Sequence, residues 1–406
     1  MSASVRQQRD VVIACYLGWT LDAFDFFIMA FVLGDVAQEF GTGVTAVSFA
    51  VLLTLAMRML GALIFGRIAD RYGRRPALMA SILGYSLFGF ASGLAPSLTV
   101  FLILRALFGI AMGGEWGVGA SLTMESIPPQ WRGRVSGLLQ AGYPSGYLLA
   151  SVLYGLVHTW AGWRGMFMMG AVPALLVFYI RSHVPESPDW EHRDRARRSG
   201  AAPTEGLVAV IRRHAGLTVH AVLLMTAFNF FSHGTQDIYP RFLQAGHHIT
   251  GWALTAIAVT YNIGAILGGL VFGTVSEWIG RRRAIGLAAL LALPVVPLWA
   301  FTGNPLLIGA GAFLMQFAVQ GAWGVVPAHL NELSPPEIRA TFPGLTYQLG
   351  NLIAAVNLPL QSGIADRLGG DYRWPLAGVA VVAAVAILLL VASGREARGV
   401  RMGHEA

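Results

Sequence analysis

The sequence contains no lysine, only one cysteine and few charged residues of any kind. Asp, Glu, Lys and Arg make up 12% of its 406 residues, whereas about a quarter of an ordinary soluble domain is charged. The single cysteine, Cys15, lies in an apolar run, which argues against a secreted scaffold held by disulfides. The net charge of +7 comes from arginine alone, and the positions of those arginines matter more than their sum. We therefore expect no nucleic-acid partner.

The sequence also lacks the motifs that mark enzymes, cofactor sites and metal sites. It has no Walker-type phosphate loop, no dinucleotide-binding glycine pattern after a strand and no His/Cys cluster with metal-ligand spacing. The adjacent His247 and His248 fall in an expected external loop, and we assign no metal to them. No pairing of a nucleophile with a base emerges either. We expect neither an enzyme nor a bound cofactor.

Long apolar runs dominate what is present, and 55% of the residues are hydrophobic. A hydrocarbon core of about 30 Å needs roughly 20 apolar residues per crossing, so twelve crossings use about 240 residues. The predicted helices cover 11–33, 45–65, 77–95, 98–122, 135–157, 163–181, 217–242, 251–275, 284–302, 305–327, 340–364 and 373–393. The first run holds Asp22 and Asp25 and exceeds a signal core in length, so it is not a cleaved signal. We predict an all-α polytopic membrane protein with twelve transmembrane helices.

Most loop arginines fall on one side of this predicted bundle. Arg164, Arg241, Arg367 and Arg373 are the exceptions. Positively charged loops stay in the cytoplasm, so we expect both termini there. The one long polar connection, 182–215, mixes arginines with acids and predicts a cytoplasmic linker with some contact to anionic lipid.

The sequence repeats itself at an offset of 207 residues. The matching motifs are Gly66-x3-Asp70-x2-Gly73-Arg74-Arg75 with Gly273-x3-Glu277-x2-Gly280-Arg281-Arg282, Trp116-Gly117 with Trp323-Gly324, and Glu125 and Arg132 with Glu332 and Arg339. Two halves of the same orientation, related by an axis along the membrane normal, usually hold a substrate site between them near the midplane. We expect one six-helix half over 1–181, the linker over 182–215 and a second six-helix half over 216–406.

Three motifs resemble those of the major facilitator superfamily. The run from Gly66 to Arg75 is similar to that superfamily's loop between helices 2 and 3. Arg105-x3-Gly109-x3-Gly113 resembles its helix 4 signature, and Pro185-Glu186-Ser187-Pro188 resembles the segment after helix 6. The resemblance covers nearly the whole chain and implies the twelve-helix major facilitator fold.

Within the superfamily, two further segments, Leu21 to Phe26 and Gly113 to Gly117, look like the sialate:proton symporter family. The run from Asn229 to Pro240 resembles the helix 7 signature of that family's lactate and pyruvate permeases. Those permeases extend the motif to a threonine, where this chain has Arg241.

The resemblance implies a secondary transporter of a bacterial inner membrane that imports a small organic anion with protons by alternating access. A lactate-like or pyruvate-like monocarboxylate is the leading substrate, and sialic acid is the alternative within the family. The alternative from another class is a transporter-like sensor that binds without moving its ligand, and the complete gating motifs argue against it. We expect the chain to function as a monomer.

The repeated acids and arginines form a predicted cytoplasmic gate. Asp70 lies among arginines, where it can exchange ion pairs or cap a helix N-terminus across the interface between the halves. The alternative is that the arginines only fix the topology. The predicted gate residues are Asp70, Arg71, Arg74, Glu125, Arg132, Glu277, Arg281, Glu332 and Arg339.

Ionisable side chains inside the predicted helices are candidates for proton coupling, because each costs about 2.5–3.5 kcal/mol to insert. His233 and Asp237 are four residues apart on one face of a helix, and imidazole titrates near pH 6.5, so this pair leads. A structural hydrogen-bonded pair is its alternative. Asp25 with Arg105 comes second, because the resemblance implies that such an acid and arginine pair in the superfamily's proton-coupled sugar carriers. The predicted proton-coupling residues are Asp22, Asp25, Glu115, His233 and Asp237.

An anionic substrate needs a cation, and arginine can bind a carboxylate through two donors. Arg58 and Arg105 are the only deep arginines, and we favour Arg58. Its alternative role is an ion pair with Asp22 or Glu115 that stabilises the first half. The predicted substrate-binding residues are Arg58, Arg105, Asn229, Gln236, Tyr143 and Gln348. The further polar candidates, each of which could equally join helices together, are Gln140, Gln316, Gln320, Tyr347 and Asn351.

Overall fold

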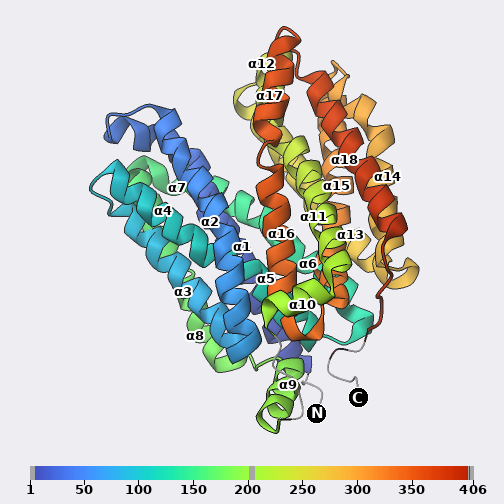
Figure 1. Ribbon diagram of the computed structural model, residues 1–406. Helices are drawn as coiled ribbons and strands as arrows, with labels where there is room; N and C mark the ends of the chain where they lie inside the picture. The colour runs from blue at the N-terminus through green and yellow to red at the C-terminus, as the bar shows by residue number, and fades with distance from the viewer. Residues whose placement is uncertain (1–4, 201–205, 401, 403–406) are drawn as a thin grey trace.

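The computed structural model describes residues 5–200, 206–400 and 402, and every regular element within these ranges is a helix (Figure 1). Residues 201–205 of the predicted linker lie outside the described residues. The N-terminal half comprises α1 (Val5–Glu39), α2 (Val44–Tyr72), α3 (Arg74–Gly93), α4 (Leu98–Gly113), α5 (Glu115–Ser126), η1 (Pro129–Trp131), α6 (Arg132–Gln140), α7 (Gly142–Met168), η2 (Met169–Ala171) and α8 (Ala174–His183).

The connecting segment and the C-terminal half are also helical. The connecting segment contains α9 (Pro188–Arg198) and α10 (Leu207–Arg213). The C-terminal half comprises α11 (Ala215–Gln236), α12 (Tyr239–His247), α13 (Gly251–Ile279), α14 (Arg281–Ala300), α15 (Pro305–Leu333), η3 (Pro336–Ile338), α16 (Thr341–Ala354), α17 (Asn357–Arg367) and α18 (Arg373–Ser393).

Within the described ranges, ten segments are long and apolar enough to cross a membrane. One of them, 129–183, covers two predicted helices, which the structure separates at the kinked residue Gly162 (φ 60°, ψ −171°). The predicted helix 340–364 is divided into α16 and α17, of 14 and 11 residues, and neither piece reaches spanning length alone. The all-α polytopic fold is thus confirmed, and the breaks explain why ten segments are found where twelve crossings are predicted.

Close backbone contacts between α2 and α4 fix the position of Arg58. A Cβ atom on Gly113 would lie 2.1 Å from the Arg58 carbonyl oxygen, and one on Gly109 would lie 2.3 Å from the Thr54 carbonyl oxygen. Such distances are possible only for glycine, so the glycines of the helix 4 motif let the two helices touch along their backbones.

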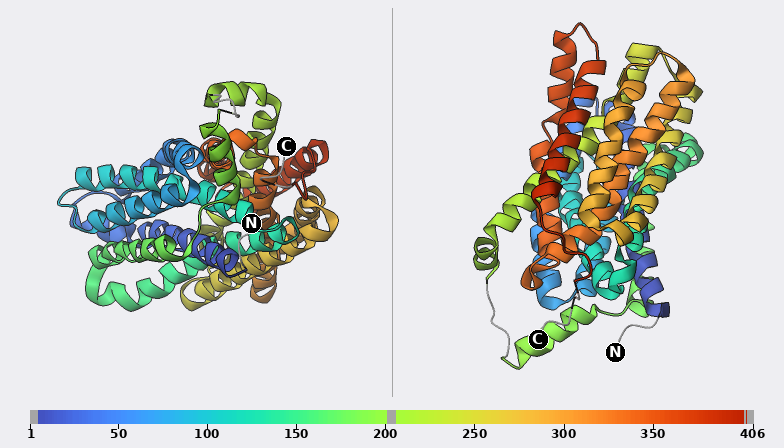
Figure 2. Two further views of the ribbon diagram at one scale, coloured as in Figure 1. Left: turned by 90° about the horizontal axis from the view of Figure 1, so that it is seen from below. Right: turned by 90° about the vertical axis from the view of Figure 1, so that its right-hand side faces the viewer.

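The two halves meet at one end of the molecule, which we call the closed end. There α2 packs on α16, and α6 packs on α13 and α15. A Cβ on Gly137 would lie 2.2 Å from the Gly269 carbonyl oxygen, and one on Gly66 would lie 2.7 Å from the Thr341 Cα, so glycines permit this contact too. The start of α1, α9 and α10 lie at this end (Figures 1 and 2). At the opposite end, which we call the open end, α12 and α17 diverge from the helices of the N-terminal half (Figure 1).

Candidate functional site

A cavity of about 680 Å³ lies between the two halves. Its lining runs from Leu33 and Leu358, toward the open end, down to Tyr143, His233 and Gln320. A second, much smaller cavity of about 30 Å³ continues from its floor and has room for about two water molecules. The residues that line both cavities are Phe26, Leu55, Tyr143, His233, Gln320 and Asn351.

Arg58 lines the small cavity at the floor of this space. Its residue is only 3% exposed, and its guanidinium carbon lies 5.8 Å from the centre of the Tyr347 ring. The Nε and Nη2 atoms are buried and have no hydrogen-bond partner within the described residues. Buried donors without acceptors are costly, so Arg58 is poised to receive an acceptor.

Two buried acids, Asp22 on α1 and Glu115 on α5, lie close enough to Arg58 to interact electrostatically with its positive charge. All four of their carboxylate oxygens are buried without a hydrogen-bond partner in the described part of the chain. Glu115 approaches α1 so closely that a Cβ on Gly18 would lie 2.6 Å from its Oε1 atom. Arg58 therefore lies between the small cavity and two buried acids. Neither acid forms an ion pair within 4 Å among the described residues.

His233 lies on the cavity wall with oxygen atoms against both of its ring nitrogens. Nδ1 is 3.1 Å from Oδ2 of Asp237, and Nε2 is 3.2 Å from Oδ1 of Asn351. A neutral imidazole can donate to only one of these oxygens, whereas an imidazolium donates to both. All three side chains line the large cavity, so the predicted pair faces the space between the halves.

At the closed end, acids of each half bind the N-terminus of a helix in the other half. Asp70, at the end of α2, accepts hydrogen bonds from the backbone amides of Ala340 and Thr341 at 3.0 and 3.1 Å. Glu277, at the end of α13, accepts one from the backbone amide of Gly133 in the first turn of α6. Carboxylates are favoured at helix N-termini because the free amides and the helix dipole both attract them.

Beside each of these caps lies a buried ion pair. Arg74 donates to Glu125 at 3.0 and 2.8 Å, and Arg281 donates to Glu332 at 3.0 and 3.1 Å. Both arginines also contact the capping acids, Arg74 at 3.2 Å from Asp70 and Arg281 at 3.3 Å from Glu277. We call the six residues of the two caps and the two ion pairs the latch; they are Asp70, Arg74, Glu125, Glu277, Arg281 and Glu332.

The comparison with known proteins agrees with this repeated architecture. The family model described as Major Facilitator Superfamily matches residues 15–258 and 236–403. The chain belongs to the major facilitator superfamily. A probable 4-methylmuconolactone transporter of Cupriavidus pinatubonensis is 31% identical over 375 residues, which cover 89% of this chain and 86% of the relative. The sialic acid transporter NanX of Escherichia coli is 26% identical and covers 97% of this chain and 95% of its own.

Solved structures show the same superfamily fold. The proton:xylose symporter XylE, bound to 6-bromo-6-deoxy-D-glucose, superposes with a TM-score of 0.77 over 98% of both chains at 18% identity. At that identity the likeness concerns the fold alone. These relatives do not show whether the chain belongs to the sialate branch or to the monocarboxylate branch of the superfamily. One is named a transporter of 4-methylmuconolactone and the other a transporter of sialic acid.

The structure places the two deep arginines of this superfamily member in different surroundings. Arg105 lines neither cavity; its Nε donates to Ser92 Oγ at 3.1 Å, and its guanidinium lies 4.0 Å from the centre of the Phe108 ring. Asp25 interacts with the Arg105 charge, but its buried Oδ2 atom has no hydrogen-bond partner among the described residues. Only Arg58 of the two predicted substrate arginines reaches the cavity.

The other predicted binding residues differ in their access to the cavities. Tyr143 lines both cavities, Asn229 lines the small one and Gln236 lines the large one. Gln236 donates to Gln316 Oε1 at 2.7 Å, so part of its amide is already engaged. Gln348 is buried and lines neither cavity, although its Oε1 atom has no partner in the described chain.

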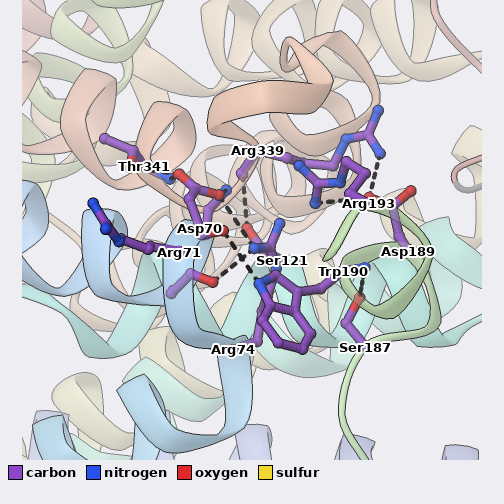
Figure 3. A network of polar contacts seen from close by, with 12 residues as sticks. Asp70, Arg71, Arg74, Ser121, Ser187, Asp189, Trp190, Arg193, Arg339 and Thr341 are labelled. Carbon is purple, nitrogen blue, oxygen red and sulfur yellow. Dashed lines mark hydrogen bonds and ion pairs between the residues drawn. The ribbon is translucent and has the colours of Figure 1, made fainter. Parts of the chain in front are cut away.

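The connecting segment takes a larger part in the closed end than the sequence indicates. Asp189 of α9 lies 2.8 Å from Arg339 of the C-terminal half (Figure 3). Arg193 of α9 lies 3.5 Å from Glu125 of the N-terminal half. Helix α9 thus bridges both halves. Among the other predicted gate residues, Arg132 lies 3.8 Å from Glu332. The exposed Arg71 is not part of the latch, and its guanidinium carbon lies 5.6 Å from the centre of the Tyr72 ring.

Two further acids, Glu186 and Glu396, each cap one helix, α3 in the N-terminal half and α14 in the C-terminal half. The sequence alone assigned neither of them a role. Glu186 accepts hydrogen bonds from the backbone amides of Arg74 and Arg75 at 2.9 and 3.1 Å, at the start of α3. Glu396 does the same for Arg281 and Arg282 at the start of α14, at 3.3 and 3.1 Å. Burial raises the pKa of Glu186 above its usual value, and these amide bonds oppose the shift. The two acids are 210 residues apart, so a search at an offset of 207 misses them.

Proposed function

We propose that the chain imports a small organic carboxylate together with protons across a bacterial inner membrane by alternating access. Membership of the major facilitator superfamily supports transport, and the named substrates of its relatives include a muconolactone and sialic acid. The observation that carries the proposal is Arg58, a buried arginine with two unpartnered donors at the floor of the cavity between the halves.

Arg58 has the donors that a carboxylate needs. Its Nε and Nη2 atoms can donate side by side to two carboxylate oxygens, which is the geometry that favours arginine over lysine. The pairing would satisfy both donors and neutralise a buried cation. A carboxylate at this position would also lie beside His233 and Asn351, which line the same small cavity.

Arg58 can also couple the substrate to a proton. Without a substrate it is the cation within range of Asp22 and Glu115. A bound carboxylate would compete for that cation, and protonation of either acid would then become more favourable. His233 with Asp237 offers a second proton site on the cavity wall, beside the same substrate position. Asp25 with Arg105 remains a third candidate for the proton site, although neither residue lines either cavity.

The latch supports alternating access. In the present state it holds the arginine-rich end shut while the cavity extends toward the opposite end. We assign the closed end, and with it both termini, to the cytoplasm by the positive-inside rule. Import then requires the latch to break and the open end to close around the substrate, with differences of a few kcal/mol between the two states.

The helix 7 resemblance favours lactate or pyruvate as the substrate, and the helix 1 and helix 4 resemblances favour sialic acid. The 680 Å³ cavity accommodates either acid. A membrane sensor of the same fold would bind the carboxylate without moving it. We propose that the transporter functions as a monomer, with lipid around its apolar helices, and that it needs neither a cofactor nor a metal.

Uptake into proteoliposomes tests this function. Purified full-length protein would be supplied with a panel of labelled carboxylates, including lactate, pyruvate and sialic acid, with and without an inward proton gradient. We expect accumulation of at least one carboxylate above equilibrium only when the gradient is present, and counterflow of the same compound without it. Binding without counterflow would indicate the sensor, and accumulation independent of the proton gradient would refute proton symport.

A further inference from the structure

The two walls of the large cavity differ in chemistry. The wall from the N-terminal half is apolar and rich in aromatic rings; its aromatic members are Phe26, Phe27, Tyr143 and Tyr147. The wall from the C-terminal half carries one ring, that of Tyr261, and most of the hydrogen-bonding side chains of the cavity; the others are His233, Gln236, Asp237, Asn262, Gln320, Asn351 and Asn357. A ligand that fills this space therefore meets four of the five lining rings on one side and amides, an imidazole, a carboxylate and the Tyr261 ring on the other.

The aromatic wall is part of a continuous row of rings along α1 and α7. Tyr143 stacks on Trp19 with ring centres 5.6 Å apart, and it meets Phe27 edge-on at 5.1 Å. Phe27 meets Tyr147 at 4.9 Å, and Tyr147 meets Phe31 at 5.8 Å. Because the rings hold one another, the faces that border the cavity are fixed in place, as a binding surface for a flat ligand requires.

Unused hydrogen-bonding atoms lie on the polar wall. Oε1 of Gln320 and Oδ1 of Asn357 are buried and have no hydrogen-bond partner in the described residues. Both residues line the large cavity. Buried acceptors without donors are unusual in a protein interior, so this wall keeps hydrogen-bonding capacity that a ligand or water can use once these side chains turn toward it.

We propose that the transported carboxylate is a planar, unsaturated ring acid that bears a second hydrogen-bonding group. Its carboxylate binds Arg58, its ring lies against Phe27 and Tyr143, and its second polar group faces the amide-lined wall. This assignment rests on the proposed function, in which Arg58 holds the carboxylate. A three-carbon acid can bind Arg58, but it is too small to contact both walls of the 680 Å³ cavity.

Calorimetric titration of the purified full-length protein tests this substrate class. The probes are 4-hydroxybenzoate, benzoate, cyclohexanecarboxylate, lactate and sialic acid. We expect affinity to fall in the order 4-hydroxybenzoate, benzoate, cyclohexanecarboxylate, lactate. The aromatic acid should exceed its saturated counterpart by about 2- to 10-fold, the range of an aromatic pair. Lactate or sialic acid binding more tightly than benzoate would overturn the inference.

Two phenylalanine variants locate the effect. Phe27→Leu should reduce the preference for benzoate over cyclohexanecarboxylate to near unity, because Phe27 borders the cavity. Phe31→Leu is the matched control; Phe31 belongs to the same row of rings but does not line the cavity, so the preference should stay. An unchanged preference in Phe27→Leu would contradict the inference.

Arg58→Gln separates this inference from the function on which it rests. Loss of binding of every acid in Arg58→Gln supports the carboxylate site, even if lactate then proves to be the best ligand of the unaltered protein and the ring assignment fails. Unchanged binding of all five acids in Arg58→Gln would instead refute the carboxylate site, and the ring assignment with it.

Discussion

Asp70 and Thr341, 271 residues apart, form one cap across the interface between the halves. The Asp70 carboxylate accepts hydrogen bonds from both the backbone amide and the hydroxyl of Thr341, at 3.1 and 2.6 Å. An acid at the end of a helix in one half thereby completes the first turn of α16 in the other half. The contact exists only while the closed end is shut, so its energy favours that state over the alternative.

Asp70→Asn should weaken the closed state, because the amide keeps one acceptor oxygen but loses the charge that favours a helix N-terminus. We expect a loss of about 1–2 kcal/mol, which raises the population open at this end by about 5- to 30-fold. Ala340→Cys, in a Cys15→Ala background, reports the opening through its rate of thiol labelling, since Ala340 is 1% exposed. Asp371→Asn, which alters an acid that pairs with Arg373 at 2.7 Å, is the control. Equal labelling in both variants would mean that Asp70 does not hold the end shut.

Glu332→Gln should destabilise the folded protein by about 3 kcal/mol, because it leaves the buried Arg281 guanidinium without its closest acid. Arg281 retains Glu277 at 3.3 Å, which places the cost at the lower end of the range for a broken buried ion pair. Glu125→Gln should cost a similar amount, since Arg74 retains Asp70. Thermal unfolding in detergent measures both losses, with Glu191→Gln on the exposed face of α9 as the control. A cost below about 1 kcal/mol would show that water or another group replaces the lost acid.

The internal repeat made much of the closed end predictable. Because Asp70 recurs as Glu277 and Glu125 recurs as Glu332 at one offset, the sequence indicates two equivalent clusters, and the structure brings the members of each together. The part taken by α9 was not predictable in the same way. Asp189 and Arg193 belong to the linker, which is not repeated, so they have no counterparts at the offset of the repeat. Their partners Arg339 and Glu125 lie 150 and 68 residues away, so nothing local distinguishes them from a solvated charge run.

His233→Asn should impair accumulation more than exchange. Exchange needs only the binding site and alternating access, whereas accumulation also needs a proton to load and leave with the substrate. We expect proton-driven uptake to fall strongly and to lose its dependence on pH between about 5 and 8, while counterflow is kept. Asp22→Asn, on the other side of Arg58, should show the same separation if the buried acids carry the proton. Equal loss of both activities in His233→Asn would assign His233 to substrate binding, and no loss in either variant would direct attention to Asp25 and Arg105.

The sequence favours Arg58 over Arg105, but it does not show which of the two reaches the cavity. Both lie within apolar helices, and their roles depend on which way each helix is turned. That rotation is set by backbone contacts such as Gly113 against the Arg58 carbonyl oxygen, which only the folded chain reveals. The break between α16 and α17 escaped prediction for a similar reason, because their junction lies inside the apolar run 340–364, which was predicted as one helix.

The affinity of Arg58→Gln for the best-bound carboxylate of the panel tests the central claim most directly. Loss of a bidentate, charge-assisted contact of about 1.5–3 kcal/mol should weaken binding by about 10- to 100-fold. Arg105→Gln is the matched control, because it removes an equally buried arginine that lines neither cavity, and we expect it to bind within about threefold of the unaltered protein. Full affinity in Arg58→Gln, with a loss confined to Arg105→Gln, would contradict the account and transfer the carboxylate to Arg105.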